Sequence, residues 1–341
     1  MPLVRSVFAT VISMTALASF AACGDDEDVP ARIDAAVDAP PAIDAPAVDP
    51  VARGRYLVDH VAACGDCHSP RNPDGSFQAG KELSGVECFI DVDPTSAAAG
   101  CIHSRNLTNH ATGLANRSDA EIKNMFQNGV RPNGQFLSAI MPYYVFHNMT
   151  AEDADAVVAY LRTVPGVDHQ VPASQPPFNN IPAAVQPLAE ADIPAAPVGN
   201  ASAERGRYLA AKAGLCIECH TPHTQPGSPK EIDVTKVFQG GQAYPSALFG
   251  LPVPPFPETI YSANITPHAN GIAGRTVAQI VATLKQGVDP QGNGVCPPMP
   301  AGPMAAFGGL TDADATDIAT YILALPPGAN MVPNGCAIPQ Q

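Results

Sequence analysis

The chain has 341 residues, which is enough for two domains of ordinary size. Its formal net charge is −14, but the segment 23–50 holds eight acids against one arginine and so accounts for −7 of it. The remainder is only moderately acidic, which argues against nucleic-acid binding. Nine cysteines are difficult to explain in a reducing cytosol unless they serve a metal or cofactor, so they favour an exported protein.

Residues 1–22 have the layout of a secretory signal peptide, with an apolar run over 7–20 that is too short for a comfortable membrane span. Residues 19–23 (SFAAC) resemble a bacterial lipobox, although Phe20 stands where leucine is usual. The resemblance implies a lipid on Cys23, which would hold the protein at a membrane without a transmembrane helix. The alternative is a free secreted protein cut nearby.

Residues 23–50 are rich in alanine, proline and aspartate and contain almost no large apolar side chains. Such a segment cannot bury enough surface to fold, so we expect a disordered acidic tether.

The rest of the chain contains an internal repeat. Four segments of the first half recur in order in the second half: 53–57 (RGRYL) as 205–209, 64–68 (CGDCH) as 216–220 (CIECH), 104–108 (SRNLT) as 262–266 (SANIT), and 153–161 as 314–322. This order predicts two domains on one plan, residues 51–165 and 203–341, with a C-terminal tail in the second. Residues 166–202 are rich in proline and alanine and are predicted to be an extended linker.

Apolar periodicity predicts three helices in each copy, in equivalent places. They are a lead-in helix (53–62 and 204–212), a second helix (119–128 and 277–286), and a terminal helix capped by Thr150 or Thr311. Strand signals are nearly absent. The predicted class is therefore all-α with long loops.

Each copy carries the pattern CxxCH. Its two thiols, one helical turn apart, can form thioethers with the two vinyl groups of a haem, and the adjacent histidine can bind the iron from one face. A redox-active CxxC or part of a zinc site is the alternative, but two copies in an exported chain favour two covalently bound haem c groups. The residues involved are Cys64, Cys67 and His68, and Cys216, Cys219 and His220.

The sixth iron ligand is expected on the loop before the terminal helix. Counted from Pro132 and Pro290, the two copies place Met141 and Met299 at the same distance, each followed by proline. Methionine is more often core filler than ligand, yet the aligned pair favours ligation. The competing candidates are Met149, Met304 and His147, none of which has an aligned counterpart of its own kind.

Ligation by histidine and methionine stabilises ferrous iron and raises the reduction potential relative to two imidazoles. An iron with both axial positions filled offers no site for a substrate. The arrangement therefore predicts an electron carrier and not an enzyme.

With these motifs the chain resembles bacterial class I c-type cytochromes, and in particular the multihaem cytochrome subunits that accept electrons from membrane-associated alcohol, aldehyde and sugar-acid dehydrogenases. The resemblance covers roughly residues 52–165 and 203–327, although those subunits usually carry three haems and this chain has two motifs. It implies that four residues lie near haem edges, within reach of the propionates: Asn106, Thr108, Asn264 and Thr266. Turn chemistry is the alternative for these four.

Four cysteines remain after the thioether cysteines and Cys23. An even remainder in an oxidising compartment predicts disulfides, and proximity within each copy favours Cys88 with Cys101 and Cys296 with Cys336 over the crossed pairings.

We therefore expect a periplasmic dihaem cytochrome c, a membrane-anchored lipoprotein that relays electrons from a dehydrogenase to a terminal acceptor such as an oxidase or another cytochrome. The alternative is a dihaem enzyme such as a cytochrome c peroxidase, in which one haem keeps a methionine and the other is open. Such an enzyme should break the pattern in one copy, whereas Met141 and Met299 correspond.

Overall fold

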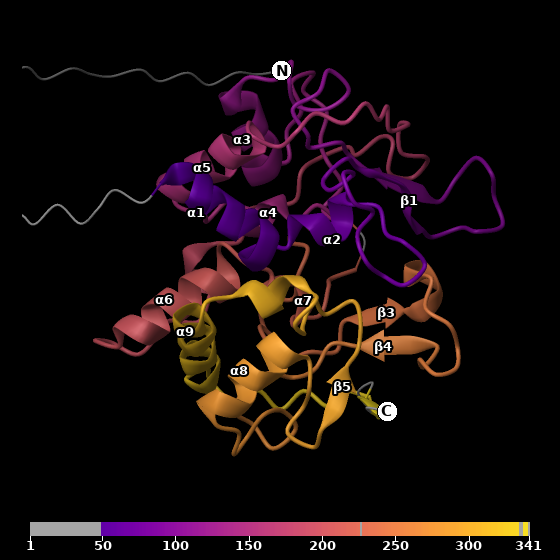
Figure 1. The fold of residues 1–341 in the computed structure, drawn as a ribbon. Helices are drawn as coiled ribbons and strands as arrows, with labels where there is room; N and C mark the ends of the chain where they lie inside the picture. The colour runs from indigo at the N-terminus through magenta and orange to yellow at the C-terminus, as the bar shows by residue number, and fades with distance from the viewer. Residues whose placement is uncertain (1–48, 226, 334–336, 340–341) are drawn as a thin grey trace, which may run out of the picture. The chain divides into compact units, whose positions relative to one another are not determined.

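Capping side chains set where the longer helices begin. In this computed structural model, which describes residues 49–225, 227–333 and 337–339 (Figure 1), Thr150 caps α5 (Ala151–Leu161) and Thr311 caps α9 (Asp312–Leu323). Each threonine side chain accepts a hydrogen bond from the amide three residues on, which satisfies a donor that the first helical turn leaves free. Both predicted caps are confirmed.

The second helix of each copy also agrees with the sequence. The structure has α3 at Asp119–Asn128 and α8 at Val277–Gln286, each opened by a capping box and closed by a left-handed glycine. The lead-in helices begin earlier than expected. The first is α1 (Pro50–Tyr56), continued by the π-helix η1 (Leu57–Val61), and the second is α6 (Ala201–Ala211).

Shorter helical segments complete the helical part: α2 (Cys64–His68), α4 (Tyr143–Phe146), η2 (Glu190–Asp192), α7 (Cys216–Cys219), η3 (Ser246–Phe249) and η4 (Ala306–Gly309). None of the described helices is long and apolar enough to cross a membrane.

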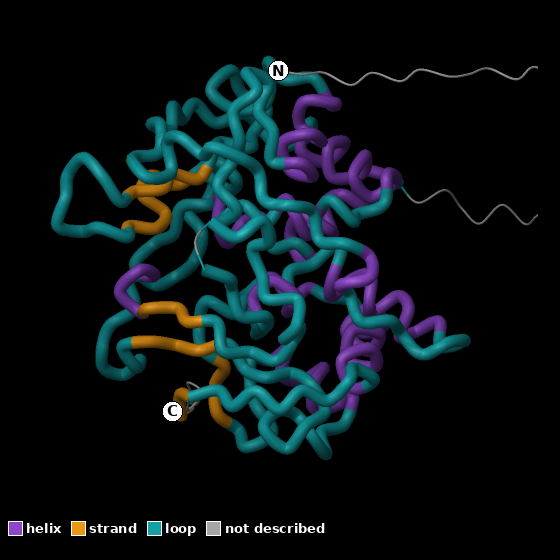
Figure 2. The backbone as a smooth tube through the Cα atoms, turned by 180° about the vertical axis from the view of Figure 1, so that it is seen from behind, coloured by secondary structure: helices purple, strands orange, loops and turns teal. Residues whose placement is uncertain are grey.

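The described residues are mostly helical, as the sequence predicts, but they also contain three small antiparallel strand pairs that it does not predict. They are β1 (Val86–Asp91) with β2 (Cys101–Ser104), β3 (Ala243–Pro245) with β4 (Thr259–Tyr261), and β5 (Asn293–Val295) with β6 (Ala337–Pro339). These strands are too short, or too irregular in register, to leave a clear alternating pattern in the sequence. Figure 2 shows the strands gathered along one side of the described chain and most of the helices along the other.

Two helix pairs organise the packing, because α1 lies against α5 and α6 lies against α9 in the same way. The core is one continuous cluster that includes buried residues from both copies, such as Leu57, Val157, Leu209 and Ile318. The described residues cluster as one compact unit. The boundaries of the two predicted domains therefore stay a prediction.

The predicted linker runs across this unit and contributes buried side chains to it, among them Val171, Leu188 and Ile193. Residues 1–48 lie outside the described residues, and with them the predicted signal peptide, nearly all of the tether, and Cys23.

Candidate haem-binding sites

The two CxxCH motifs form single helical turns, α2 in the first copy and α7 in the second. Residues three apart on a helix share a face, so Cys64 lies beside Cys67 and Cys216 beside Cys219. All four thiols are free and none of these residues is fully exposed. Paired free thiols next to a histidine are the donor set that covalent haem attachment requires.

Both motif histidines are held by the same backbone contact. The Nδ1 atom of His68 lies 2.7 Å from the carbonyl oxygen of Arg105, and the Nδ1 atom of His220 lies 2.7 Å from the carbonyl oxygen of Ala263. A carbonyl oxygen only accepts hydrogen bonds, so Nδ1 donates and carries the proton. The lone pair of Nε2 is then available for a metal, and the ring is oriented as ligating histidines usually are.

Burial sets the charge of these groups. Burial lowers the pKa of His68 and of His220, and this effect is larger than the rise caused by the hydrogen bond to the carbonyl. Both imidazoles are therefore kept neutral, as iron ligands must be. Burial also raises the pKa of the Cys64, Cys67 and Cys216 thiols to about 12. A redox-active CxxC needs a thiol with a lowered pKa, so the electrostatics argue against that alternative.

The carbonyls that hold the histidines sit in the repeated Ser-x-Asn-(Leu/Ile)-Thr segments. In the first, the Asn106 Oδ1 atom accepts from the amide and the hydroxyl of Thr108 at 2.9 and 2.7 Å. In the second, Asn264 binds Thr266 in the same way at 3.0 and 2.8 Å.

The side chains of Asn106 and Asn264 also form hydrogen bonds with the segment that follows each terminal helix. The Asn106 Nδ2 atom donates to the carbonyl oxygen of Val167, and that of Asn264 donates to the carbonyl oxygen of Gly328. These contacts favour turn chemistry over propionate binding for the four residues, because their polar atoms already have partners within the chain. Their proximity to a haem edge stays a prediction.

The two methionine loops share one hydrogen-bonding pattern. The Met141 amide donates to the carbonyl oxygen of Ser138 at 3.1 Å, and the Met299 amide donates to that of Cys296 at 3.3 Å. The carbonyl oxygens of Met141 and Met299 in turn accept from Tyr143 and Ala301, at 2.7 and 2.9 Å. The correspondence expected from the sequence thus extends to the backbone of both loops.

The rival ligands have different surroundings. Met304 is 96% exposed, and His147 lies on the surface with its Nδ1 atom 2.9 Å from the Asn128 side chain. Met149 is buried in the core. Met141 and Met299 are partly buried against the core, and their role as iron ligands stays a prediction.

A small apolar cavity adjoins Cys216. Most of its lining comes from the second copy, including Leu209, Leu284 and Phe307, but Val61 belongs to the first copy. Apolar surroundings of this kind suit a porphyrin ring. The free thiols and the oriented histidine beside it are the groups that fit covalent attachment of a haem.

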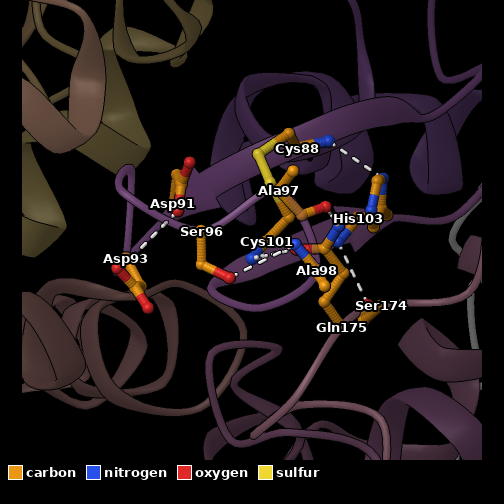
Figure 3. The surroundings of a disulfide bond; sticks show 10 residues. All are labelled: Cys88, Asp91, Asp93, Ser96, Ala97, Ala98, Cys101, His103, Ser174 and Gln175. Atoms are coloured by element: carbon orange, nitrogen blue, oxygen red, sulfur yellow. Dashed lines mark hydrogen bonds between the residues drawn. A yellow bond between two sulfur atoms is a disulfide. The ribbon is translucent and has the colours of Figure 1, made fainter.

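A disulfide joins Cys88 of β1 to Cys101 of β2, with the Cα atoms 4.9 Å apart (Figure 3). The backbone of both cysteines is hydrogen-bonded. The Cys88 amide donates to the His103 Nδ1 atom, and the Cys101 amide donates to the Gln175 side chain. Cys296 is buried. Cys336 lies outside the described residues, so its pairing with Cys296 stays a prediction.

No protein-family model matches the chain. Among curated proteins it is 33% identical over 182 residues to the fructose dehydrogenase cytochrome subunit of Gluconobacter japonicus, a match that covers 50% of this chain and 35% of that protein. It is 28% identical over 192 residues to the cytochrome c subunit of the quinone alcohol dehydrogenase of Gluconacetobacter polyoxogenes, covering 54% of this chain and 38% of that one. Its homologues include cytochrome c subunits of fructose, alcohol and gluconate dehydrogenases and a diheme cytochrome c.

A third relative is a diheme cytochrome c-type protein of Cereibacter sphaeroides, 30% identical over 118 residues, which cover 34% of this chain and 36% of that one. The chain thus spans little more than a third of the length of these relatives. Such homologues imply covalently bound haem c and support electron transfer in general.

Sequence reasoning missed the contacts between the two copies. Tyr56 and Tyr208 of the repeated RGRYL segments bond to aspartates of the opposite copy. The repetition of the tyrosine was the available signal. It marked a shared role, but not which copy supplied the partner.

Proposed function

We propose that this chain is a dihaem c-type cytochrome that carries single electrons. The observation that supports it best is the duplicated arrangement of His68 and His220, each beside two free, partly buried thiols and each with its Nδ1 atom hydrogen-bonded to a backbone carbonyl. Two such centres in one chain provide two carriers in series.

The residues have distinct roles in this proposal. Cys64, Cys67 and their counterparts Cys216 and Cys219 attach the haems, while His68 and His220 bind the irons through Nε2. A bound haem supplies a one-electron couple. Met141 and Met299 close the opposite faces, so that no water or substrate reaches the metal and the chain acts as a carrier rather than an enzyme.

The donor in this proposal is a dehydrogenase and the acceptor an oxidase or another cytochrome. Support comes from the relatives, which are cytochrome subunits of fructose and alcohol dehydrogenases. We place the protein on the periplasmic side, anchored through lipid on Cys23, because the signal-like N-terminus and covalent haem attachment both belong to exported proteins.

The test is spectroscopy of the purified, oxidised protein together with the intact mass. The mass should show two haems per chain, and the weak long-wavelength band of methionine sulfur on ferric iron should be present. Met141→His and Met299→His should each remove about half of that band. Met304→His, at an exposed methionine, is the matched control and should leave it unchanged.

A single haem per chain, or a band that survives both substitutions, would contradict the proposal. A high-spin signal that responds to peroxide would show one open iron and favour the dihaem enzyme. Lipid on Cys23 is checked separately by metabolic labelling with a fatty acid, which a Cys23→Ser variant should no longer incorporate.

A further inference from the structure

The first copy contains a polar cavity of about 90 Å³ on the side of the predicted linker. Its polar lining consists of two cations, Arg105 and Arg131, together with neutral side chains such as Gln135, Ser174 and Asn179. None of the described residues that line it is acidic. A site with two positive charges and only neutral donors around them is suited to an anion.

Neither arginine has a negatively charged partner among the described residues, since none of the described ion pairs includes one of them. The Arg105 Nε atom is buried without a hydrogen-bond partner, while one of its terminal nitrogens donates to the carbonyl oxygen of Pro172 at 2.6 Å. The Arg131 guanidinium makes no hydrogen bond within the described part of the chain.

Leaving these cations unpaired has an electrostatic cost. Burial, and then the positive charge of Arg131, lower the pKa of Arg105, and burial lowers the pKa of Arg131. Two half-buried like charges side by side are unfavourable unless an anion compensates them. The cavity therefore calls for an anionic group that the described residues do not provide.

One of the two arginines holds an expected ligand of the first iron, and the other lies on the loop that carries the second expected ligand. The carbonyl oxygen of Arg105 accepts the hydrogen bond from His68. Arg131 lies between α3 and α4, on the loop that leads to Met141. The two arginines thus lie on the two segments between which a haem bound to His68 and Met141 would be held.

We propose that Arg105 and Arg131 bind the propionate carboxylates of the first haem and make it the higher-potential centre of the chain. This rests on the proposed dihaem function. A haem carries two carboxylates on one edge, which matches two adjacent arginines, and each arginine can bind a carboxylate through two nitrogens.

The second copy lacks both cations. The residue aligned with Arg105 is Ala263, and the residue aligned with Arg131 is Asp289. The Asp289 carboxylate accepts from the amides of Gln291 and Asn293 in its own turn. A neutral residue and an acid thus stand where the first copy has two positive charges.

This asymmetry gives the transfer a direction. Positive charge stabilises the added electron of a ferrous haem, and a negative charge opposes it. One electron passes from the ferrous second haem to the ferric first haem, so that the second is oxidised and the first reduced without proton transfer. The first haem is then the exit for electrons and the second the entry.

The test is a redox titration of the full holoprotein followed by absorbance, resolved into two one-electron components. Met299→His identifies the second haem, because replacing its methionine lowers only that midpoint. In the wild type, the higher midpoint should belong to the first haem. Arg131→Gln and Arg105→Gln should each lower the midpoint potential of the first haem. The expected change is about tenfold in the equilibrium constant for its reduction, which is about 59 mV for one electron.

Arg117→Gln is the matched control, because it removes the same charge from an exposed position of the same copy. It should leave both midpoints in place. The mass of every variant establishes that two haems remain attached. If two haems are present but the first midpoint does not move, or the second haem has the higher midpoint, this proposal is overturned while the carrier function stands.

A free anion is the other source of negative charge for the cavity. Titrating the wild type with inorganic phosphate distinguishes the two, since a propionate-filled site should give midpoints independent of phosphate at constant ionic strength. The assignment to propionates would be overturned if the midpoint potential of the first haem changed with phosphate concentration and this dependence were lost in Arg131→Gln. A chain that contains no haem at all would instead refute the proposed function itself.

Discussion

The hydroxyl of Tyr56 donates a 2.6 Å hydrogen bond to the carboxylate of Asp314, and the two residues belong to different copies of the repeat. The relationship is reciprocal, because the Tyr208 hydroxyl donates to Asp153 at 2.6 Å. Each carboxylate also binds an arginine of its own copy, Arg205 for Asp314 and Arg53 for Asp153. The repeated RGRYL segments therefore hold each copy together and join it to the other.

Removing one tyrosine hydroxyl should weaken the whole unit. Tyr56→Phe takes a hydrogen bond from a carboxylate that is largely buried, with a side chain 5% exposed. Bonds to charged groups of this kind contribute about 2 kcal/mol, and we expect the free energy of unfolding to fall by that amount in urea denaturation. Tyr208→Phe should lower the free energy of unfolding by a similar amount.

The control for this prediction is Tyr261→Phe, because the Tyr261 hydroxyl makes no hydrogen bond with any described residue. Its unfolding curve should match that of the wild type. Equal stability of Tyr56→Phe and Tyr261→Phe would mean that water replaces the bond between the copies at no cost.

The same carboxylates predict a dependence of stability on pH. Burial alone would raise the pKa of Asp153 and of Asp314, but the hydrogen bonds from arginine and tyrosine outweigh it and hold both pKa values below the usual range. Groups with a lowered folded pKa stabilise the protein above their unfolded pKa, about 3.9, and this contribution is lost as the pH falls through the folded values.

Urea unfolding of the wild type and of Asp314→Asn between pH 7 and pH 3 measures this contribution. The variant should be less stable at neutral pH, and the difference should shrink as the pH falls below about 4. A difference that stays constant over this range would show that the carboxylate charge of Asp314 does not contribute to stability.

The sequence was sufficient where local chemistry decides the structure. Thr150 and Thr311 cap helices because a threonine oxygen satisfies a nearby amide, and residues 119–128 and 277–286 are helical as their apolar spacing predicted. The aligned positions of Met141 and Met299 likewise gave loops with the same backbone bonds.

The features that the sequence does not predict depend on contacts between segments far apart in the chain. The bond from Tyr56 to Asp314 joins positions 258 residues apart, and no local pattern distinguishes it from a bond within one copy. The cavity of Arg105 and Arg131 forms because the segment around Ser174 folds back over the first copy. That these two arginines have no acidic partner among the described residues can be seen only once the fold has placed those residues.

The disulfide between Cys88 and Cys101 should stabilise the first copy. It closes a short loop, with a separation of 13 residues, and a loop of this length contributes about 3 kcal/mol by restricting the unfolded chain. The double variant Cys88→Ala, Cys101→Ala should lose that amount in urea unfolding under oxidising conditions. Adding a reductant should lower the stability of the wild type and leave the variant unchanged, and a wild type that does not respond would contradict the prediction.

Two glycines allow the helix pairs to approach closely, and alanine there should be strongly destabilising. A Cβ atom on Gly54 would lie 1.8 Å from the carbonyl oxygen of Ala156, and one on Gly206 would lie 1.9 Å from that of Asp317. Alanine ordinarily favours a helix over glycine by about 1 kcal/mol. At these two positions the overlap with backbone atoms should outweigh that preference, so that alanine destabilises the protein.

We expect Gly54→Ala and Gly206→Ala each to lower the free energy of unfolding by about 3 kcal/mol, as overpacking of a tight contact does. Thermal and urea unfolding measure the loss, with Glu204→Ala on the exposed face of α6 as a control that should stay within about 0.5 kcal/mol of the wild type. The overlapping atoms are backbone carbonyls, which cannot rotate away as a side chain can. A stable Gly206→Ala protein would therefore require α6 and α9 to separate, and the bond from Arg205 of α6 to Asp314 of α9 would then have to lengthen or break.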